Sequence, residues 1–306
     1  MLETSIEITR KSSPPAFMMR CTALGVAALL AIGCGDSDDD TDNTDTLSNQ
    51  EVVELVLQQG LVGGDVSVVE EYVLEDYIQH STLAADGRAG LLQAIDALAG
   101  ISVEIHRTLV EGDLVATHNT YTVPDGSQMV AFDVFRLEDG RLAEHWDALQ
   151  TLVPASETVS GRSMVDGPTT IDNSADTAAN KQLVSGFVED ILTNGNFDVV
   201  TDYVSTETYN QHNPLVADGL DGLNEFVASL AADGIGFGYT RTPLIVAQGD
   251  FVLTGSEGFF GPSDAAPFAV FYDLFRVENG KIVEHWDVIP NPAPDPDNLP
   301  HDNGLF

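Results

Sequence analysis

Two stretches of this chain are near-copies of each other. Residues 132–147 read FDVFRLEDGRLAEHWD and residues 272–287 read YDLFRVENGKIVEHWD, with nine of the sixteen positions identical. Each stretch places an Asp-Gly or Asn-Gly pair between two runs of β-forming residues, which is the strongest short-range signal of a two-residue hairpin turn. The sequence therefore predicts the same β-hairpin twice.

The repetition extends well beyond the hairpin. Tyr77-Ile-Gln-His80 matches Tyr209-Asn-Gln-His212, and Ala85-Asp86-Gly87 matches Ala217-Asp218-Gly219. Each copy spans about 105 to 115 residues, the size of a complete domain rather than of a solenoid repeat. We predict tandem domains at residues 49–153 and 180–290, a linker at 154–179 and a proline-punctuated tail at 291–306.

The first copy shows the expected secondary structure most clearly. Residues 49–62 space their apolar side chains as a helix does, residues 66–74 indicate a second helix, and Asp86 can cap a third. Helices followed by an antiparallel meander predict an α+β domain, in which about three N-terminal helices cover one face of a curved sheet. Its strands are expected at 102–110, 113–123, 128–138 and 141–149.

The hairpin turn also predicts which side chains share a face of the sheet. A two-residue turn at Asp139-Gly140 pairs Phe135 with Glu144 and Asp133 with Trp146. These four side chains are then expected to share one face of the sheet, whereas a β-bulge would undo this register. The second copy is expected to repeat the pattern, with Asp273, Phe275, Glu284 and Trp286 on one face. His285 and Asp287, like His145 and Asp147, are expected on the other face.

The N-terminal region has the elements of an export signal. A short basic start at Met18 is followed by an apolar run from Thr22 to Ile32. That run is too short for a membrane-spanning helix, which needs about 20 apolar residues. Because the residues before Cys34 resemble the bacterial lipobox, residues 1–34 are predicted to be a lipoprotein signal with Cys34 as the lipidation site. An ordinary signal peptide cut nearby is the alternative, and the acidic residues 35–48 are predicted to form a disordered tether.

Composition limits the classes of partner. The formal net charge is −37 with only 12 Lys and Arg, so nucleic acid or an anionic membrane surface would be repelled. Membrane attachment is therefore expected only through the lipid at Cys34, in the cell envelope. Both cysteines precede the predicted domains, and no HxH or HExxH spacing occurs. We expect no bound metal and no cofactor.

Together these motifs carry a family resemblance. Tyr-x-Gln-His, Ala-Asp-Gly and Asp-x-Phe-Arg-x-Glu-x-Gly-x-x-x-Glu-His-Trp-Asp, present in both copies, resemble SnoaL-like domains of the nuclear-transport-factor-2-like superfamily. The resemblance covers residues 49 to 290. It implies a cone, in which a strongly bent antiparallel sheet wraps around helices and leaves a pocket at the open end. It also implies that the two domains pair within the chain as the subunits of a homodimer do.

The resemblance further implies a chemistry. Polyketide cyclases of this family close a ring by aldol condensation without metal or cofactor, using an aspartate on one strand and a histidine on a neighbouring strand. The aspartate matches Asp133 in the first copy and Asp273 in the second, and the histidine matches His118. The second copy has Gly255 at that place, so its catalytic set is expected to be incomplete and its role closer to binding or scaffolding.

The residue types fit such a reaction physically. Removing a proton next to a carbonyl needs a base that burial has strengthened, and Phe135, Trp146 and Glu144 around Asp133 would have that effect. His80 or His118 would then donate to the oxygen that gains charge in the enolate. In the alternative, Asp133 only accepts a hydrogen bond from the backbone and His80 only satisfies backbone groups.

These inferences define a set of predicted site residues and a function. The favoured function is a pocket for a small hydrophobic carbonyl compound, with aldol, lyase or isomerase chemistry. The alternative is a non-catalytic ligand-binding or scaffold lipoprotein of the cell envelope, and export argues against the polyketide reaction itself because that substrate is made in the cytoplasm. The catalytic candidates are Asp133, His118, His80, Asp273 and His212, and the substrate-binding candidates are Tyr77, Phe135, Glu144, Trp146, Tyr209, Phe275, Glu284 and Trp286.

Overall fold

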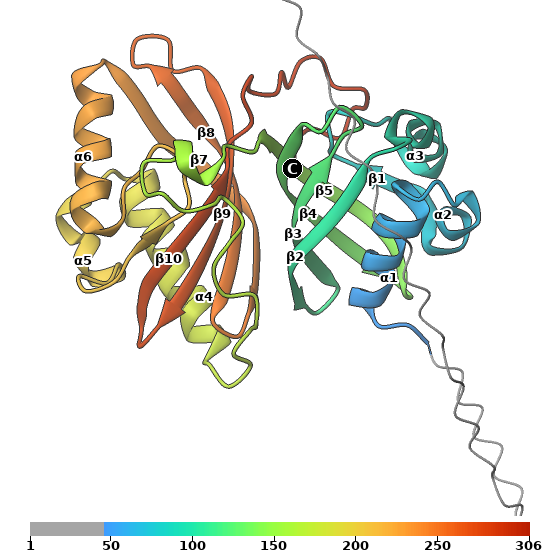
Figure 1. Cartoon of the computed structure of the whole chain (residues 1–306), viewed down its shortest axis with the longest axis horizontal. Helices are drawn as coiled ribbons and strands as arrows, with labels where there is room; N and C mark the ends of the chain where they lie inside the picture. Colours follow the sequence, from blue (N-terminus) through green and yellow to red (C-terminus); the bar gives the residue numbers. More distant parts are fainter. Residues whose placement is uncertain (1–45) are drawn as a thin grey trace, which may run out of the picture. The chain divides into compact units, whose positions relative to one another are not determined.

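The computed structural model describes residues 46–306 (Figure 1). The predicted signal, the lipidation site Cys34 and most of the tether lie outside the described residues. Within residues 46–306, every helix falls short of the length and apolar character that a membrane crossing requires. Below, domain 1 denotes residues 49–153 and domain 2 denotes residues 180–290.

Domain 1 consists of helices followed by a five-stranded sheet, and Figure 1 shows α1–α3 on one side of that sheet. Its first helix starts where Ser48 and Glu51 form a capping box, each side chain bonding the other residue's backbone amide. The helical segments are α1 (Asn49–Leu55), the π-helical η1 (Val56–Leu61), α2 (Val66–Tyr72), α3 (Gly87–Ala94) and η2 (Ile95–Leu98). The strands are β1 (Val73–Gln79), β2 (Ser102–Glu111), β3 (Leu114–Thr122), β4 (Gln128–Glu138) and β5 (Arg141–Thr151), in the spatial order β1-β5-β4-β3-β2.

Domain 2 repeats this plan of helices and a five-stranded sheet. A short linker turn, η3 (Ala155–Glu157), precedes it. Its helical segments are α4 (Thr177–Phe187), the π-helical η4 (Val188–Thr193), η5 (Phe197–Val199), α5 (Val200–Tyr203) and α6 (Gly219–Ala232). Its strands are β6 (Asn210–Gln211), β7 (Ile235–Gln248), β8 (Phe251–Pro262), β9 (Phe268–Glu278) and β10 (Lys281–Val288), in the order β6-β10-β9-β8-β7.

The α+β prediction, with helices preceding each antiparallel meander, is confirmed. One strand was not predicted: β1 follows α2 directly and pairs in parallel with β5. Asp86 precedes α3 as expected but does not cap it with its side chain. Its carboxylate instead accepts a hydrogen bond from the backbone amide of Gln79, at 2.9 Å, and so holds the end of β1.

The predicted register of the hairpin is wrong beyond its first pairs. Asp139 and Gly140 both have positive φ, at 49° and 71°, as the expected turn requires, and Leu137 pairs with Leu142. The next pair is Arg136 with Glu144, so Ala143 is an extra residue on β5. A β-bulge of this kind turns every later side chain to the opposite face. Domain 2 has the same irregularity, at Val283.

The bulge determines which side chains of the repeated motif lie on each face of the sheet. In domain 1 Asp133 pairs with Asp147 and Phe135 with His145, so these four side chains share the inner face. Val134 pairs with Trp146, and Arg136 with Glu144, on the outer face. In domain 2 the inner set is Asp273, Phe275, His285 and Asp287, and the outer set is Leu274, Arg276, Glu284 and Trp286.

Both faces of each sheet are buried, but against different partners. Phe135 packs on the inner face against the helices of domain 1, and Phe275 packs against those of domain 2. The outer faces share a single core cluster, which contains Val134, Trp146, Leu274 and Trp286 among others. Of the two faces, only the inner one can therefore border a pocket that lies within a single domain.

Candidate functional site

An Asp-His-Asp group lies on the inner face of each sheet. In domain 2 Asp273 is on β9, His285 and Asp287 are on β10, and all three side chains are buried. Asp273 and Asp287 are directly opposed across the two strands, and the bulge brings His285 to the same face. In domain 1 the corresponding group is Asp133, His145 and Asp147.

The first aspartate of each group is fully engaged by hydrogen bonds. Asp273 Oδ1 lies 3.0 Å from His285 Nε2, and Asp273 Oδ2 accepts a hydrogen bond from the Tyr239 hydroxyl at 2.8 Å. Because both of its oxygens accept hydrogen bonds, this carboxylate anchors the histidine and has no unpaired oxygen. In domain 1, Asp133 is held in the same way by His145 (3.2 Å), Tyr121 (3.0 Å) and Asn119 (2.7 Å).

A glutamine fixes the histidine from its other side. Gln211 Oε1 accepts a hydrogen bond from the backbone amide of Asn213 at 3.2 Å, which sets the orientation of the side-chain amide. His285 Nδ1, 3.0 Å from the same oxygen, must therefore carry a proton and donate it. Gln79 holds His145 Nδ1 at 2.9 Å in domain 1, again with its oxygen bonded to backbone amides.

This arrangement favours the charged form of the histidine. Burial lowers the pKa of His285, but the hydrogen bond with Asp273 and the negative charges of Asp287 and Asp273 outweigh burial and raise the pKa above its ordinary value. With Nδ1–H already fixed, a protonated Nε2 donates to Asp273. The raised pKa and the two hydrogen bonds therefore both favour an imidazolium at His285, held by Gln211 and Asp273.

The second aspartate is the one with a free oxygen. Asp287 Oδ2 accepts a hydrogen bond from Asn213 Nδ2 at 2.6 Å, whereas the buried Oδ1 has no hydrogen-bond partner among the described residues. Burial raises the pKa of Asp287 to about 6, with a further contribution from the charge of Asp273, although the charge of His285 opposes the rise. Asp147 in domain 1 also has its pKa raised to about 6, and burial is again the largest cause.

A large cavity opens at this group in domain 2. Its volume is about 490 Å³, within the range of small-molecule sites, and Asp273, His285 and Asp287 all line it. Most of the remaining wall is aromatic or aliphatic. It includes Phe187, Phe197, Phe226, Phe237, Phe260 and Phe271, with Tyr209 and Tyr239 near the carboxylates.

The cavity beside the Asp-His-Asp group of domain 1 is smaller. A smaller cavity of about 270 Å³ reaches Asp147 but is lined by neither Asp133 nor His145. Its walls include Leu83, Met129 and the tail residues Pro290–Pro292. The sequence favoured domain 1 as the better-equipped domain, and the structure places the larger cavity in domain 2 instead.

Several predicted site residues lie on the outer face. The prediction that Glu144 and Trp146 share the pocket with Asp133 is wrong, because the bulge turns them away, and the same correction applies to Glu284 and Trp286. Conversely, His145 and His285, which were expected to face away, line the inner face. Phe135 and Phe275 are on the inner face as predicted, and Tyr209 lines the domain 2 cavity.

His118 is also on the outer face and does not meet Asp133. It pairs with Phe132, which neighbours Asp133 on β4 and points the opposite way, and its ring stacks on the Phe132 ring. Burial and the nearby charge of Arg107 lower the pKa of His118 well below its ordinary value. The neutral ring therefore accepts a hydrogen bond at Nδ1 from Arg107, at 3.0 Å. Gly255 at the matching place thus removes nothing from the domain 2 pocket.

His80 and His212 lie beside the outer-face residues rather than in the pockets. His80 Nε2 is 3.0 Å from Glu144 Oε1, and His212 Nε2 is 3.0 Å from Glu284 Oε1. The predicted convergence of Asp133, His80 and His118 is therefore not found. Both histidines instead contact segments from outside their own sheets.

The residues that could hold a metal ion are the same Asp-His-Asp groups. In each domain one ligand atom from each of the three side chains lies within 4.8 Å of the others. In domain 2, His285 Nδ1 is held by Gln211 and Nε2 by Asp273, so a cation could be bound only if the ring released Asp273. The hydrogen-bonded arrangement suits proton transfer without such a release.

Sequence reasoning missed the residues that complete the group. Asp287, Gln211 and Tyr239 were not among the candidates, although the first two recur in the other copy as Asp147 and Gln79. A signal existed, since each is a polar residue kept within a repeated motif. That signal could not be used, because only the bulge places Asp287 on the inner face and the sequence does not mark the bulge.

Family models match both halves of the chain. Residues 53–145 match the model of a SnoaL-like domain, and residues 182–293 match the model of a SnoaL-like polyketide cyclase. The search of curated proteins found no match.

Solved structures similar to this chain each align with about a third of it. IdmH from Streptomyces antibioticus, a candidate polyketide cyclase, is 20% identical over 34% of this chain and 93% of its own, with a TM-score of 0.29. TsrD from Streptomyces laurentii is 22% identical over 33% and 87%, with a TM-score of 0.29. An NTF2-like protein of unknown function from Mesorhizobium loti is 20% identical over 36% and 94%, with a TM-score of 0.31.

Proposed function

Because the chain belongs to the SnoaL-like family and carries two of its domains in tandem, we propose that domain 2 binds a small hydrophobic carbonyl compound and transfers a proton on it. Asp287 is the general base in this proposal. One observation carries it: the buried Asp287 Oδ1 has no hydrogen-bond partner among the described residues, and Asp287 lines an apolar cavity of about 490 Å³. An unmet acceptor in a ligand-sized cavity is the position at which a substrate proton would be taken up.

The proposed reaction begins at the carbon next to the carbonyl. Asp287 Oδ1 takes the proton, the C–H bond breaks, and its electron pair moves onto the carbonyl oxygen to give an enolate. The enolate then recovers the proton from Asp287 at carbon, which is isomerisation or exchange, or its carbon attacks a second carbonyl. In that aldol addition the oxygen of the second carbonyl takes the proton from Asp287, which restores the base. No redox step and no cofactor are needed for the atoms and electrons to balance.

The environment of Asp287 supports this role. A carboxylate whose pKa is about 6 is a stronger base than an ordinary aspartate and is still ionised at neutral pH. The neighbouring His285, held by Gln211 and Asp273, supplies a positive charge that stabilises the developing enolate. Asp273 acts through His285 as a positioning residue.

Proton exchange tests the proposal without knowledge of the natural substrate. A panel of aryl-substituted ketones in deuterated buffer is expected to lose α-protons with the protein at least about 100-fold faster than in buffer alone, as general base catalysis provides. Proton NMR follows the loss. Ala269→Trp, which fills the cavity from β9, is expected to reduce the rate at least about tenfold. If no ketone in the panel binds or exchanges, the proposal fails.

A non-catalytic ligand-binding lipoprotein is the second candidate. The largely apolar wall of the cavity favours it, because such a wall can retain a hydrophobic ligand without chemistry. Saturable ketone binding with no acceleration of exchange would select this candidate over the first.

We further propose that the chain is exported and held in the cell envelope by a lipid on Cys34. The basic start, short apolar run and lipobox-like residues before Cys34 support this proposal. Cys34→Ser in the full-length chain is expected to move the protein from the membrane fraction to the soluble fraction, as detected by immunoblotting after ultracentrifugation. Continued sedimentation of the variant with membranes would refute the lipid anchor.

A further inference from the structure

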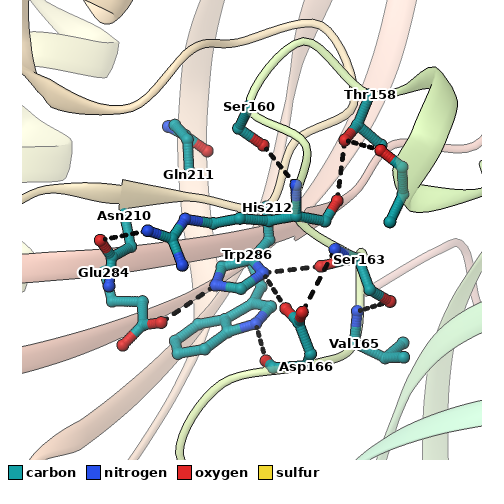
Figure 2. A network of polar contacts seen from close by, with 12 residues as sticks. Thr158, Ser160, Ser163, Val165, Asp166, Asn210, Gln211, His212, Glu284 and Trp286 are labelled. Carbon is teal, nitrogen blue, oxygen red and sulfur yellow. Dashed lines mark hydrogen bonds and ion pairs between the residues drawn. The ribbon is translucent and has the colours of Figure 1, made fainter.

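A segment of the linker is held on the outer side of domain 2 by His212. The ring is buried, its Nε2 lies 3.0 Å from Glu284 Oε1, and its Nδ1 donates a hydrogen bond to the backbone carbonyl of Ser163 at 2.7 Å. Arg162, one residue earlier, donates to Asp218 at 2.9 Å. Figure 2 shows the linker loop lying against His212 and the indole of Trp286, on which the His212 ring stacks.

The C-terminal tail is held on domain 1 by the same kind of contacts. His80 Nε2 lies 3.0 Å from Glu144 Oε1, and His80 Nδ1 donates a hydrogen bond to the backbone carbonyl of Gly304 at 3.0 Å. Asn303, one residue earlier, donates to Asp86 at 2.7 Å. Asp86 and Asp218 are the matching aspartates of the two Ala-Asp-Gly motifs.

The likeness continues into the next two residues of each segment. Met164 is buried in the core cluster shared by the two outer faces, and Val165, Leu305 and Phe306 pack against the same cluster. Residues 162–165 and 303–306 thus present the same order: a polar side chain, a carbonyl for the histidine, and two apolar side chains. The two segments are 141 residues apart, against 140 for Asp133 and Asp273, so both follow their sheets at nearly the same distance.

We infer that residues 162–165 and 303–306 are one duplicated element, and that each domain has a peptide-docking site which receives this element from the other domain. The docking sites are His80, Asp86 and Glu144 in domain 1 and His212, Asp218 and Glu284 in domain 2. The element that follows β5 docks on domain 2, and the element that follows β10 docks on domain 1. The exchange is reciprocal, as in a dimer whose subunits swap their C-terminal tails.

Docking of the tail also fixes part of the ligand cavity. Between β10 and its docked end, the tail passes through Pro290–Pro292, which line both the 490 Å³ cavity of domain 2 and the 270 Å³ cavity of domain 1. Holding residues 303–306 on domain 1 therefore holds a wall common to the two cavities. The docking itself does not depend on the proposed reaction.

Binding of the tail in trans tests this inference. In a chain that ends at Leu299, the domain 1 site is expected to bind a fluorescein-labelled peptide of residues 300–306, as measured by fluorescence anisotropy. His80→Ala in the shortened chain is expected to weaken peptide binding at least about tenfold, because the ring supplies the hydrogen bond to the Gly304 carbonyl. The full-length chain, whose site is occupied, is the matched control and is expected to bind the peptide at least about tenfold more weakly than the shortened chain.

Amide hydrogen exchange on the full-length chain gives an independent test if the shortened chain fails to fold. Asn303→Ala is expected to speed exchange at residues 79–86 at least about tenfold and to leave residues 211–218 unchanged. Arg162→Ala is expected to do the reverse. Equal peptide binding by the full-length and shortened chains, no peptide binding by a folded shortened chain, or unchanged exchange in both variants would overturn the inference.

Discussion

In the ketone exchange assay, the Asp287→Asn variant is expected to lose at least about 100-fold in rate while keeping its affinity for the ligand within a few-fold. The amide that replaces the carboxylate preserves the shape of the cavity wall and can still accept the hydrogen bond from Asn213. It cannot take up a proton, and general bases contribute about 10² to 10⁴ in rate. The expected kinetic result is a fall in kcat with little change in KM, measured by NMR over a series of ketone concentrations.

The matching variant in domain 1 separates the two domains. Asp147→Asn is expected to change the exchange rate by less than about twofold, because the cavity at Asp147 is the smaller one and the rest of its Asp-His-Asp group does not line it. Loss of activity in Asp147→Asn, with Asp287→Asn unaffected, would place the reaction in domain 1 and contradict the assignment. Equal losses in both variants would show that the domains act together.

Much of the fold could be predicted from sequence because its signals are local. The strands from β2 to β5 follow from alternation and from the Asp139-Gly140 turn, whose positive φ values only a few residue types accept without strain. Helices before the sheet follow from apolar spacing. The parallel strand β1 was missed because its partner β5 is more than sixty residues away, and no local signal records that pairing.

The faces of the sheet could not be predicted, and the reason is the bulge. Leu142 and Ala143 are both apolar and both buried, so no polar residue marks the extra position. Register is specified by alternation only where one face is buried and the other is solvated. Here the outer face is also buried, in the core cluster that it shares with the other domain, so alternation could not show whether His145 or Trp146 points inward.

The relative size of the two pockets also depends on features that motifs do not carry. α6 has 14 residues where α3 has eight, and β7 and β8 are longer than β2 and β3. These additions lengthen the walls of domain 2 without altering its motifs. The second copy has Gly255 where the first has His118, which suggested a weaker second site. Position 255 lies on the outer face, however, where it contributes nothing to the cavity.

The same Asp287→Asn variant is expected to change how stability depends on pH. The pKa of Asp287 is raised from 3.8 to about 6 by burial, so the folded protein holds a proton that the unfolded chain releases. The resulting stabilisation is complete below the ordinary aspartate pKa and is lost as the pH rises through about 6. For a shift of roughly two units, the loss is about 3 kcal/mol over the whole range and about 2 kcal/mol between pH 4.5 and 8.

Comparison of the variant with the natural protein isolates this contribution. Asparagine does not titrate, so the free energy of unfolding of Asp287→Asn, relative to the natural protein, is expected to rise by about 2 kcal/mol between pH 4.5 and 8 in urea unfolding experiments. His285 acts in the same direction, because its raised pKa gives stability that is lost at higher pH and depends partly on the charge of Asp287. A difference that does not vary with pH would contradict the burial of an ionising Asp287.

The two results for Asp287→Asn are informative together. A buried carboxylate with one oxygen unpaired lowers stability at neutral pH, and an amide of the same shape avoids that cost. Asp273→Asn is the matched control: both Asp273 oxygens accept hydrogen bonds, so its loss is expected to destabilise the protein at every pH. A residue whose removal stabilises the fold while abolishing turnover is retained for chemistry rather than for folding, and that pairing of outcomes distinguishes Asp287 from its structural partner Asp273.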